Sequence, residues 1–252
     1  LREKGEKLRS GLVAAAEKYS FDLRVTGAPA LFYLRLADDC NFGKVYFTQT
    51  PIAAVLGHNV PLGDSTPVFS VDIGYGLTNI AAFSLDGVIA GMSMNLGGGN
   101  IDVHIIDYMA ENYNLNIGAL TAERIKNTVG SFFPGDDKVM MVDGRDASTG
   151  APATVMVRTS NIYEVLALYV DKIIEYVSLI ISKLPSEVSS AIIHSGVFLS
   201  GGLCKMDGIA EYFSERLGIT INTFDEPQLA AVIGAGTIIS SEHFITKAAT
   251  QN

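Results

Sequence analysis

The chain has 252 residues, of which 48% are hydrophobic, enough to form one or two buried cores. Its formal net charge of −9 argues against nucleic acid, and against an anionic membrane surface, as the main partner. The two cysteines, Cys40 and Cys204, lie far apart and no secretory signal pattern is present, so we expect a cytoplasmic location. The four histidines are scattered, and we expect no structural metal site.

The first 43 residues form a segment with a pattern of its own. Apolar residues at helical spacing predict an amphipathic helix over Leu1–Tyr19. Two strands are predicted on either side of a Gly-Ala-Pro turn, at Leu23–Gly27 and Ala30–Leu36. A polar, turn-prone stretch over Ala37–Gly43 follows, and we expect a domain boundary there.

The rest of the chain has the pattern of an α/β protein, with three antiparallel strands followed by crossover helices. We predict strands within Val68–Ser84 (two), Val88–Asn95, Met140–Asp143, Thr154–Arg158, Val197–Leu199 and Ile219–Asn222. We predict helices over Ile101–Tyr113, Ala122–Ser131 and Ile162–Leu184, from Asp207 to Leu217, and over Leu229–Ser241. Charged residues interrupt the longest helix, so we expect no membrane span. Its wide apolar stripe favours core packing, with partner binding as the alternative.

Two glycine loops, each after an apolar strand pattern, suggest phosphate binding. The first, Val71–Thr78 (VDIGYGLT), is predicted to be a hairpin turn whose backbone amides face an anion, with Asp72 holding a metal through water. The second, Leu199–Leu203 (LSGGL), lies between a strand and a helix, where unpaired amides favour a nucleotide. For one isolated Gly-Gly pair, an ordinary tight turn is the alternative interpretation.

A third candidate region is the predicted helix that follows Leu120. Thr121 is a plausible N-cap, and Glu123 and Lys126 lie three residues apart on one helix face. They can pair or together line the edge of a pocket. The alternative is a solvated surface pair.

Residues 44–252 resemble the bacterial actin family of MreB-type rod shape-determining proteins. The matching segments are Pro51–Gly57, Val71–Gly76, Leu96–Asp102, Leu120–Lys126, Gly144–Gly150, Leu199–Leu203 and Ala230–Gly236, in the order and at about the spacing of the family. The resemblance implies the ribonuclease H-like second half of an actin-like ATPase fold, with a small subdomain inserted at about residues 115–158. It also implies ATP with Mg²⁺ as cofactor, self-association, a cytoskeletal role in cell shape, and the cell-wall or cell-shape machinery as partner.

The resemblance further implies which residues bind the nucleotide. Gly74, Tyr75 and Gly76 would lie at the β- and γ-phosphates, and two segments, 123–126 and 201–204, around the adenosine. The full candidate set is Asp72, Gly74, Tyr75, Gly76, Thr78, Glu123, Arg124, Ile125, Lys126, Gly201, Gly202, Leu203 and Cys204.

Several departures from the family pattern fall at these positions. Tyr75 and Leu77 replace a glycine and a hydroxyl in the first loop, and Leu203 replaces the third glycine of the adenosine loop. The acidic pair that orients the attacking water aligns with Gln49 and Thr50, neither of which can act as a general base. Gln49 can still position a water by hydrogen bonding, so we name it as the candidate catalytic residue of a degenerate site.

The expected first half of the cleft, with its Asp-x-Gly-Thr hairpin, has no counterpart in this sequence. Residues 1–43 instead look similar to the C-terminal small domain of class III aminotransferases of the glutamate-1-semialdehyde aminomutase type. The lysine domain of those enzymes has no match here, so we expect no pyridoxal phosphate. The chain therefore resembles a composite of two parts, residues 1–43 and 44–252.

Three functions stay open at this point: a degenerate actin-like nucleotide binder, a structural or interaction module without nucleotide, and an enzyme, either an ATPase or an aminotransferase relative. The missing half predicts an exposed apolar patch that drives self-association. The residues expected in this patch are Ile52, Val55, Leu56, Leu229, Val232 and Ile233.

Overall fold

The computed structural model describes residues 24–26, 33–35, 46–48, 50–57, 60, 66–84, 87–240 and 250–251. Short strands lie at both ends of this set: β1 (Arg24–Thr26) pairs antiparallel with β2 (Tyr33–Arg35), and β3 (Tyr46–Phe47) with β12 (Thr250–Gln251). The β1–β2 pair confirms the two strands predicted near the N-terminus. The helix predicted over the first nineteen residues lies outside the described residues.

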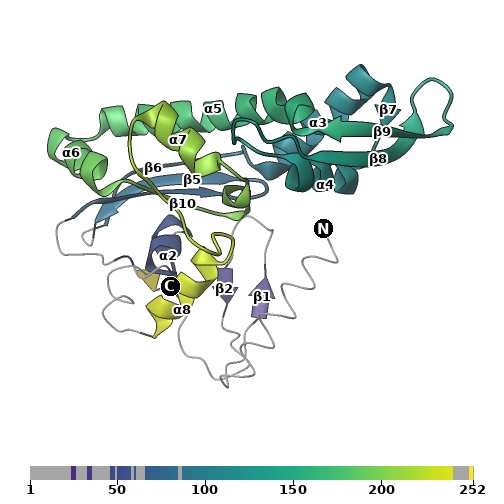
Figure 1. Cartoon of the computed structure of the whole chain (residues 1–252). Helices are drawn as coiled ribbons and strands as arrows, with labels where there is room; N and C mark the ends of the chain where they lie inside the picture. The colour runs from purple at the N-terminus through teal and green to yellow at the C-terminus, as the bar shows by residue number, and fades with distance from the viewer. Residues whose placement is uncertain are drawn as a thin grey trace.

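Among the described residues, five strands form the main sheet, in the order β11-β10-β4-β5-β6 (Figure 1). They are β4 (Val68–Ile73), β5 (Thr78–Ser84), β6 (Gly87–Met94), β10 (Val197–Ser200) and β11 (Ile221–Asn222). The first three form the predicted antiparallel meander, whereas β10 runs parallel to both β4 and β11. Since β4 is covered on both faces, nearly all of its residues are buried, Ser70 included, instead of alternating between buried and exposed.

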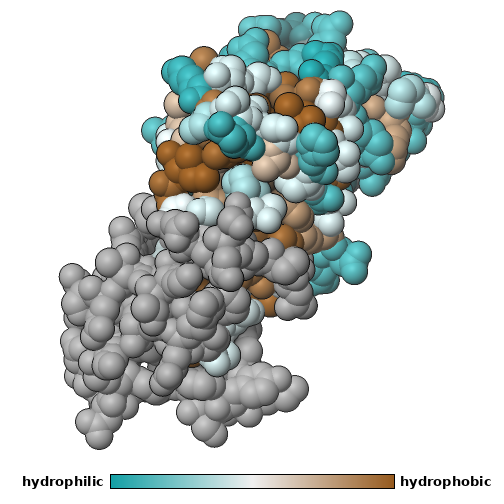
Figure 2. Space-filling model, turned by 90° about the vertical axis from the view of Figure 1, so that its left-hand side faces the viewer, coloured by the Kyte–Doolittle hydropathy of each residue, from teal (hydrophilic) through white to brown (hydrophobic). Residues whose placement is uncertain are grey.

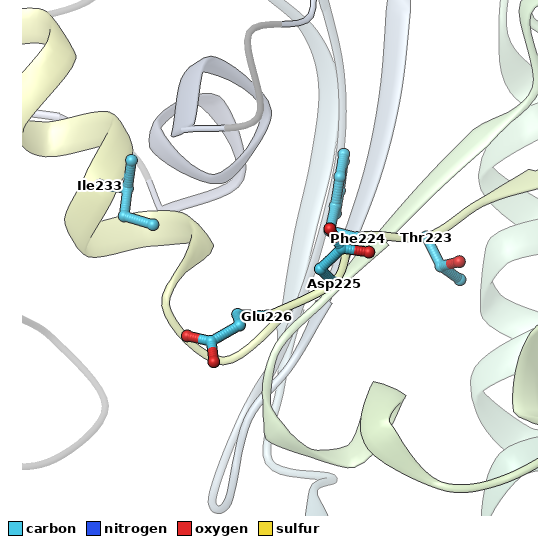
Figure 3. A pocket seen from close by; sticks show the side chains of 5 residues that line it. All are labelled: Thr223, Phe224, Asp225, Glu226 and Ile233. Atoms are coloured by element: carbon cyan, nitrogen blue, oxygen red, sulfur yellow. The ribbon is translucent and has the colours of Figure 1, made fainter.

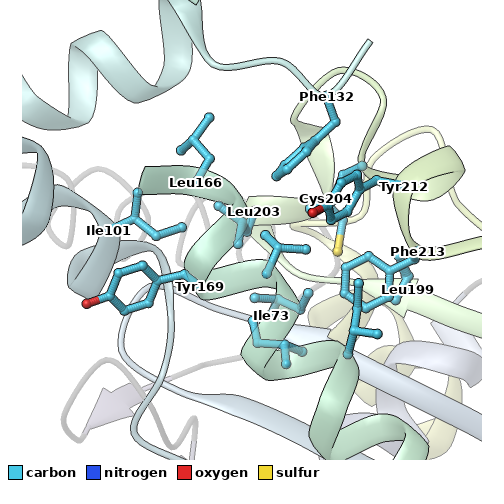
Figure 4. Close-up of a cluster of buried hydrophobic side chains, with 14 of the residues drawn as sticks. Ile73, Ile101, Phe132, Leu166, Tyr169, Leu199, Leu203, Cys204, Tyr212 and Phe213 are labelled. Carbon is cyan, nitrogen blue, oxygen red and sulfur yellow. The ribbon is translucent and has the colours of Figure 1, made fainter. Parts of the chain in front are cut away.

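Helices cover both faces of this sheet (Figure 1). They are α2 (Thr50–Gly57), α3 (Gly98–Tyr113), α5 (Thr159–Lys183), α6 (Ser186–Ser195), α7 (Ile209–Leu217) and α8 (Ala230–Ile239). The larger core joins the sheet to α3, α5 and α7, and the apolar stripe of α5 is buried in it, as core packing predicts (Figure 4). A second, smaller core joins the sheet to α2 and α8.

A small three-stranded sheet lies beside α3 and α4. It consists of β7 (Leu115–Asn116), β8 (Val139–Asp146) and β9 (Pro152–Arg158), and α4 (Ala119–Val129) packs against it. The predicted hairpin is confirmed, with strands longer than expected, since Val139 to Arg145 pairs with Pro152 to Arg158. The boundaries of an inserted subdomain at 115–158 stay a prediction.

Two local predictions differ from the structure. The N-cap of α4 is Gly118 rather than Thr121, and the helix begins before the threonine because its amide already donates to the Gly118 carbonyl. Helix α3 begins at Gly98, three residues before the predicted Ile101. Glycine has poor helix propensity, so the earlier start reflects tertiary contacts that only glycine permits there.

The prediction of an exposed patch on α2 is wrong. Ile52, Val55 and Leu56 are buried, because α2 packs on one side against the sheet and on the other against α8. Close approach of the two helices requires glycine: a Cβ at Gly234 would lie 1.6 Å from the Ala53 carbonyl oxygen. The three predicted residues of the C-terminal helix region differ from these: Leu229 and Val232 are half-buried, and Ile233 is exposed.

On the described part of the face that Figure 2 shows, several separate brown areas lie between hydrophilic ones. Within the described residues, no helix is both long enough and apolar enough to cross a membrane.

Candidate functional site

The two glycine loops lie at the same edge of the main sheet. Strands β4 and β10 are parallel neighbours, with Asp72 opposite Ser200, so the segments that follow them leave the sheet side by side. The Ser200 hydroxyl donates to Asp72 Oδ1 at 3.0 Å and joins the two strand ends. Ligands of α/β proteins bind at such carboxyl ends of parallel strands. The structure therefore brings together two segments that are more than 120 residues apart in the sequence.

The first loop is a tight turn that leaves amides free. The Gly74 amide donates to the Leu77 carbonyl oxygen at 2.9 Å, and this bond closes the turn. Within the described part of the chain, no hydrogen bond uses the amides of Tyr75 or Gly76. A Cβ built at Gly76 would meet no atom of the described residues within 4 Å. Consecutive free amides in an open turn are what an anion-binding backbone site requires.

The carbonyl side of the same turn is occupied by the N-terminus of α3. The amides of Gly98 and Gly99 donate to the carbonyl oxygens of Gly74 (3.0 Å) and Tyr75 (2.7 Å). A Cβ at Gly97 would lie 2.5 Å from the Tyr75 oxygen, so the glycine permits this approach. The first amides of a helix normally need partners, and here the loop carbonyls supply them.

Thr78 does not point its hydroxyl out of the loop. It is fully buried, and its Oγ1 donates to the Leu96 carbonyl oxygen at 2.5 Å. This bond connects the first residue of β5 to the segment that precedes α3. In the structure, Thr78 thus holds the far side of the turn.

Tyr75 places its ring beside α3. A Cβ at Gly99 would lie 2.9 Å from Tyr75 Cζ, so the ring occupies space that the glycine leaves open. The ring centroid lies 6.0 Å from Lys126 Nζ, within the range of a cation–π contact. The side chain is 45% exposed.

Lys126 is buried and paired. Its Nζ lies 2.6 Å from Asp102 Oδ1 and donates to the Gly98 carbonyl oxygen at 2.8 Å, and the lysine and aspartate side chains are 5% and 2% exposed. A solvated surface pair is therefore the wrong interpretation for this lysine. Its neighbours in α4 differ: Ile125 is in the core, Glu123 is half-buried and Arg124 is exposed.

Sequence reasoning missed Asp102. The residue lies next to Ile101 on the buried face of α3, and a buried carboxylate requires a partner. That position was the available signal. Its partner Lys126 lies 24 residues away in α4, and only the fold shows that the two side chains meet.

The second loop continues as a short 3-10 helix, η2 (Gly202–Lys205). Its glycine Gly201 has φ +93, and a Cβ there would lie 2.3 Å from the Ile73 carbonyl oxygen. Gly202 is exposed, whereas Leu203 and Cys204 are buried, with the Cys204 thiol donating to the Ser200 carbonyl oxygen at 2.9 Å (Figure 4). Burial raises the pKa of the Cys204 thiol, so it stays protonated at neutral pH.

Asp72 is the acidic group at this edge. Desolvation raises the pKa of its carboxyl, and this outweighs the hydrogen bonds from Ser200 and Asn79 that lower it. A carboxylate in this situation gains from a nearby cation. Gln49 lies outside the described residues, and Thr50 is the first residue of α2.

A pocket of about 380 Å³ lies near the second loop (Figure 3). It is lined by Thr223, Phe224, Asp225, Glu226 and Ile233, which come from the segment after β11 and from α8. The next residue, Pro227, accepts a hydrogen bond from the Gly201 amide at 2.9 Å, so the pocket is connected to the second glycine loop. The sequence patterns gave no indication of it.

Comparison with known proteins agrees with this arrangement. The family model of the MreB/Mbl protein matches residues 36–247. The chain belongs to the MreB/Mbl family. Cell shape-determining protein MreB of Escherichia coli K12 is 33% identical over 194 residues, which is 77% of this chain and 56% of that protein. Cell shape-determining protein Mbl of Bacillus cereus is 30% identical over 210 residues, 82% of this chain and 63% of that protein.

Solved structures give the same fold. MreB5 of Spiroplasma citri bound to AMPPNP aligns with a TM-score of 0.74 and 25% identity, over 79% of this chain and 59% of that one. A MamK double helical filament aligns with a TM-score of 0.61 at 18% identity, over 77% and 59%. The fold is therefore actin-like. This chain spans a little more than half the length of these relatives.

Proposed function

We propose that this member of the MreB/Mbl family is an actin-like cytoskeletal protein involved in cell shape, with a degenerate ATP site. The observation that carries the proposal is the meeting of two glycine loops at the carboxyl ends of β4 and β10. Family membership, and relatives named cell shape-determining proteins, support it. We propose a cytoplasmic location on the same basis.

The residues present fit a nucleotide in part. The free amides of Tyr75 and Gly76 suit phosphate oxygens, and the Asp72 carboxyl suits a hydrated Mg²⁺. The adenosine would then lie between the exposed edge of α4, with Glu123 and Arg124, and the loop 201–204. When bound, the Mg²⁺ ion would supply the positive charge that stabilises the Asp72 carboxylate, and the phosphates would supply acceptors for the loop amides.

Two features weaken the site. Leu77 offers no hydroxyl to a phosphate, and each charge-assisted hydrogen bond that is lost costs about 1.5–3 kcal/mol. The ring of Tyr75 also limits the approach of other groups to the turn from the side of α3. We therefore propose weak nucleotide binding and weak or absent ATPase activity.

Titration calorimetry of the full chain with magnesium-ATP tests this proposal. We expect a dissociation constant weaker than about 1 μM, and a tighter one for the double variant Tyr75→Gly/Leu77→Thr. A wild-type constant below about 1 μM would contradict the degenerate site. The alternative is a structural module that binds no nucleotide, and the departures at Tyr75 and Leu77 favour it. A folded chain that shows no heat of binding at millimolar ATP would support this alternative.

We also propose that the chain associates with itself. The relative MamK forms a double helical filament, and Ile233 is an exposed apolar residue beside the half-buried Val232. Sedimentation velocity at several concentrations, with and without ATP, should show oligomers that do not depend on nucleotide. A strictly monomeric species would contradict this, and ordered filaments that form only with ATP would contradict the degenerate site.

The domain organisation is a further part of the proposal. Residues 1–43 would be an aminotransferase-like fragment without pyridoxal phosphate, and residues 44–252 the actin-like part. Limited proteolysis should cut first within Ala37–Gly43. Protection of this stretch, with early cutting elsewhere, would show that the leading segment is integral to the core.

A further inference from the structure

Lys126 is connected to the first glycine loop by a continuous chain of hydrogen bonds. Its ammonium binds the Gly98 carbonyl oxygen, and the amide of the same Gly98 binds the Gly74 carbonyl oxygen. The Gly98 residue is thus held on both sides, by the lysine and by the turn. The connection joins α4, α3 and the loop, three segments that are far apart in the sequence.

The lysine also has a second contact with α3. Asp102, one turn into α3, accepts a charged hydrogen bond from it at 2.6 Å. Both side chains are almost fully buried, and a buried ion pair of good geometry is strongly directional. The Tyr75 ring lies near the ammonium as well, with its centroid 6.0 Å away. All three of these contacts of the lysine are with groups of the protein itself.

We infer that Lys126 is a positioning residue for the phosphate loop, and that the Asp102–Lys126 pair sets the loop geometry through Gly98. The family resemblance places this lysine at the adenosine, which is a different role. The inference rests on the proposed function, because it assigns a task within that nucleotide site. Preorganised backbone amides bind an anion better than mobile ones, since no ordering cost remains at binding.

A positioning role for Lys126 and a direct contact with adenosine predict different changes in affinity for two probes, magnesium-ATP and adenosine. If the lysine orders the phosphate loop, its loss weakens binding of phosphate-bearing ligands and leaves adenosine unaffected. If the lysine contacts adenosine, both ligands lose affinity by a similar factor. The two probes therefore separate a positioning role from direct contact.

The test uses the full chain with the double variant Lys126→Met/Asp102→Asn. Both charges are removed together, because a single buried charge without its partner destabilises the fold strongly. We expect the affinity for magnesium-ATP to fall at least about tenfold, and that for adenosine to change less than about twofold. Equal losses for both probes, or no loss for either, would overturn the inference. The matched control is Arg158→Met/Asp137→Asn, which removes an exposed ion pair of 2.8 Å and should change neither affinity.

A second readout needs no ligand and separates this inference from the proposed function. Hydrogen exchange of the free protein should be at least about tenfold faster at the Gly98 amide of the double variant, and unchanged at the Gly201 amide, which donates to Pro227. Unchanged exchange at Gly98 would overturn the inference even if ATP binds. Faster exchange at Gly98 in a chain that binds no ATP would support it and contradict only the proposed function.

A milder variant covers the case in which the double variant does not fold. Lys126→Gln/Asp102→Asn also removes both charges, but its two amide side chains can hydrogen-bond to each other, so the buried polar groups keep a partner. We expect a smaller change in the same direction, again confined to the Gly98 amide and to magnesium-ATP. Equal exchange at Gly98 in this variant and the wild type would count against the inference.

Discussion

The two glycine loops lie at neighbouring strand ends but are held in different ways. The loop after β4 is held by polar contacts from other elements, above all the amides of Gly98 and Gly99 and the lysine behind them. The loop after β10 is held mainly by its own buried side chains, Leu203 and Cys204, with one backbone hydrogen bond to a distant segment, from the Gly201 amide to Pro227. One loop thus depends on tertiary hydrogen bonds, and the other on local apolar anchors.

This difference affects how each loop responds to change. Hydrogen bonds and a buried ion pair define a geometry sharply but contribute modest net stability. Buried apolar side chains contribute more stability, in proportion to the area they remove from water. We therefore expect changes in the second loop to affect folding most, and changes around the first loop to affect its geometry.

The largest effect should come from Gly201→Ala. The residue has φ +93, and the new Cβ would lie 2.3 Å from a backbone atom of Ile73 that cannot move freely. Strain of the backbone and displacement of β4 together should cost about 4 kcal/mol of unfolding free energy. Urea denaturation measures it.

The control for this change is the adjacent Gly202→Ala. Among the residues that the structure describes, a Cβ there meets no atom within 4 Å, so stability should change by less than about 0.5 kcal/mol. Similar losses for the two variants would show that the contact with β4 is not what requires a glycine in this loop.

The second effect concerns the apolar anchor. Leu203→Ala should lower the unfolding free energy by about 3 kcal/mol, because it leaves a cavity in the larger core. Leu203→Met keeps the volume and should cost less than about 1.5 kcal/mol. Chemical denaturation of both variants checks this. An alanine variant as stable as the methionine variant would mean that this loop, too, is held mainly by polar contacts.

Local patterns in the sequence predicted the strands, the first turn and the buried face of the long helix, but not the tertiary contacts that hold them. The meander β4-β5-β6, the turn after Asp72 and the apolar stripe of α5 follow from local periodicity, and all are present. The buried pair of Lys126 with Asp102 was not predicted, because neither residue shows its partner in its own segment. Burial of α2 was also missed, since it depends on close packing with α8 near the other end of the chain.

The third effect tests the contact of the first loop with α3. Gly99→Ala would place a Cβ 2.9 Å from Tyr75 Cζ and 3.2 Å from the Tyr75 carbonyl oxygen. Alanine gains about 1 kcal/mol of helix propensity, so we expect a net loss of only about 1 kcal/mol. In a Tyr75→Ala background the same change should be neutral or stabilising, with a coupling of about 1 kcal/mol in a double-mutant cycle of urea denaturation. Additive effects would show that the ring moves away without cost.

The smallest effect concerns the carboxyl between the two loops. Burial raises the folded-state pKa of Asp72 above its ordinary value of 3.8, so the protonated form is favoured in the folded state. The stability that this gives is fully present below pH 3.8 and is lost as the pH rises through the folded-state pKa. Asp72→Asn has no charge to bury, so the wild type should lose stability relative to this variant between acidic and neutral pH.

Asp146→Asn is a control with the opposite sign. Hydrogen bonds from Thr149 and Ser148 lower the pKa of Asp146, so its contribution is present above pH 3.8 and is lost as the pH falls through the folded-state value. Urea denaturation of the two variants and the wild type, repeated across the acidic range, compares them. If the Asp72 difference showed the Asp146 sign, its carboxylate would be stabilised in the free protein, by the Ser200 hydroxyl or by loop amides, and the strand ends would already form an anion-stabilising edge before any cation binds.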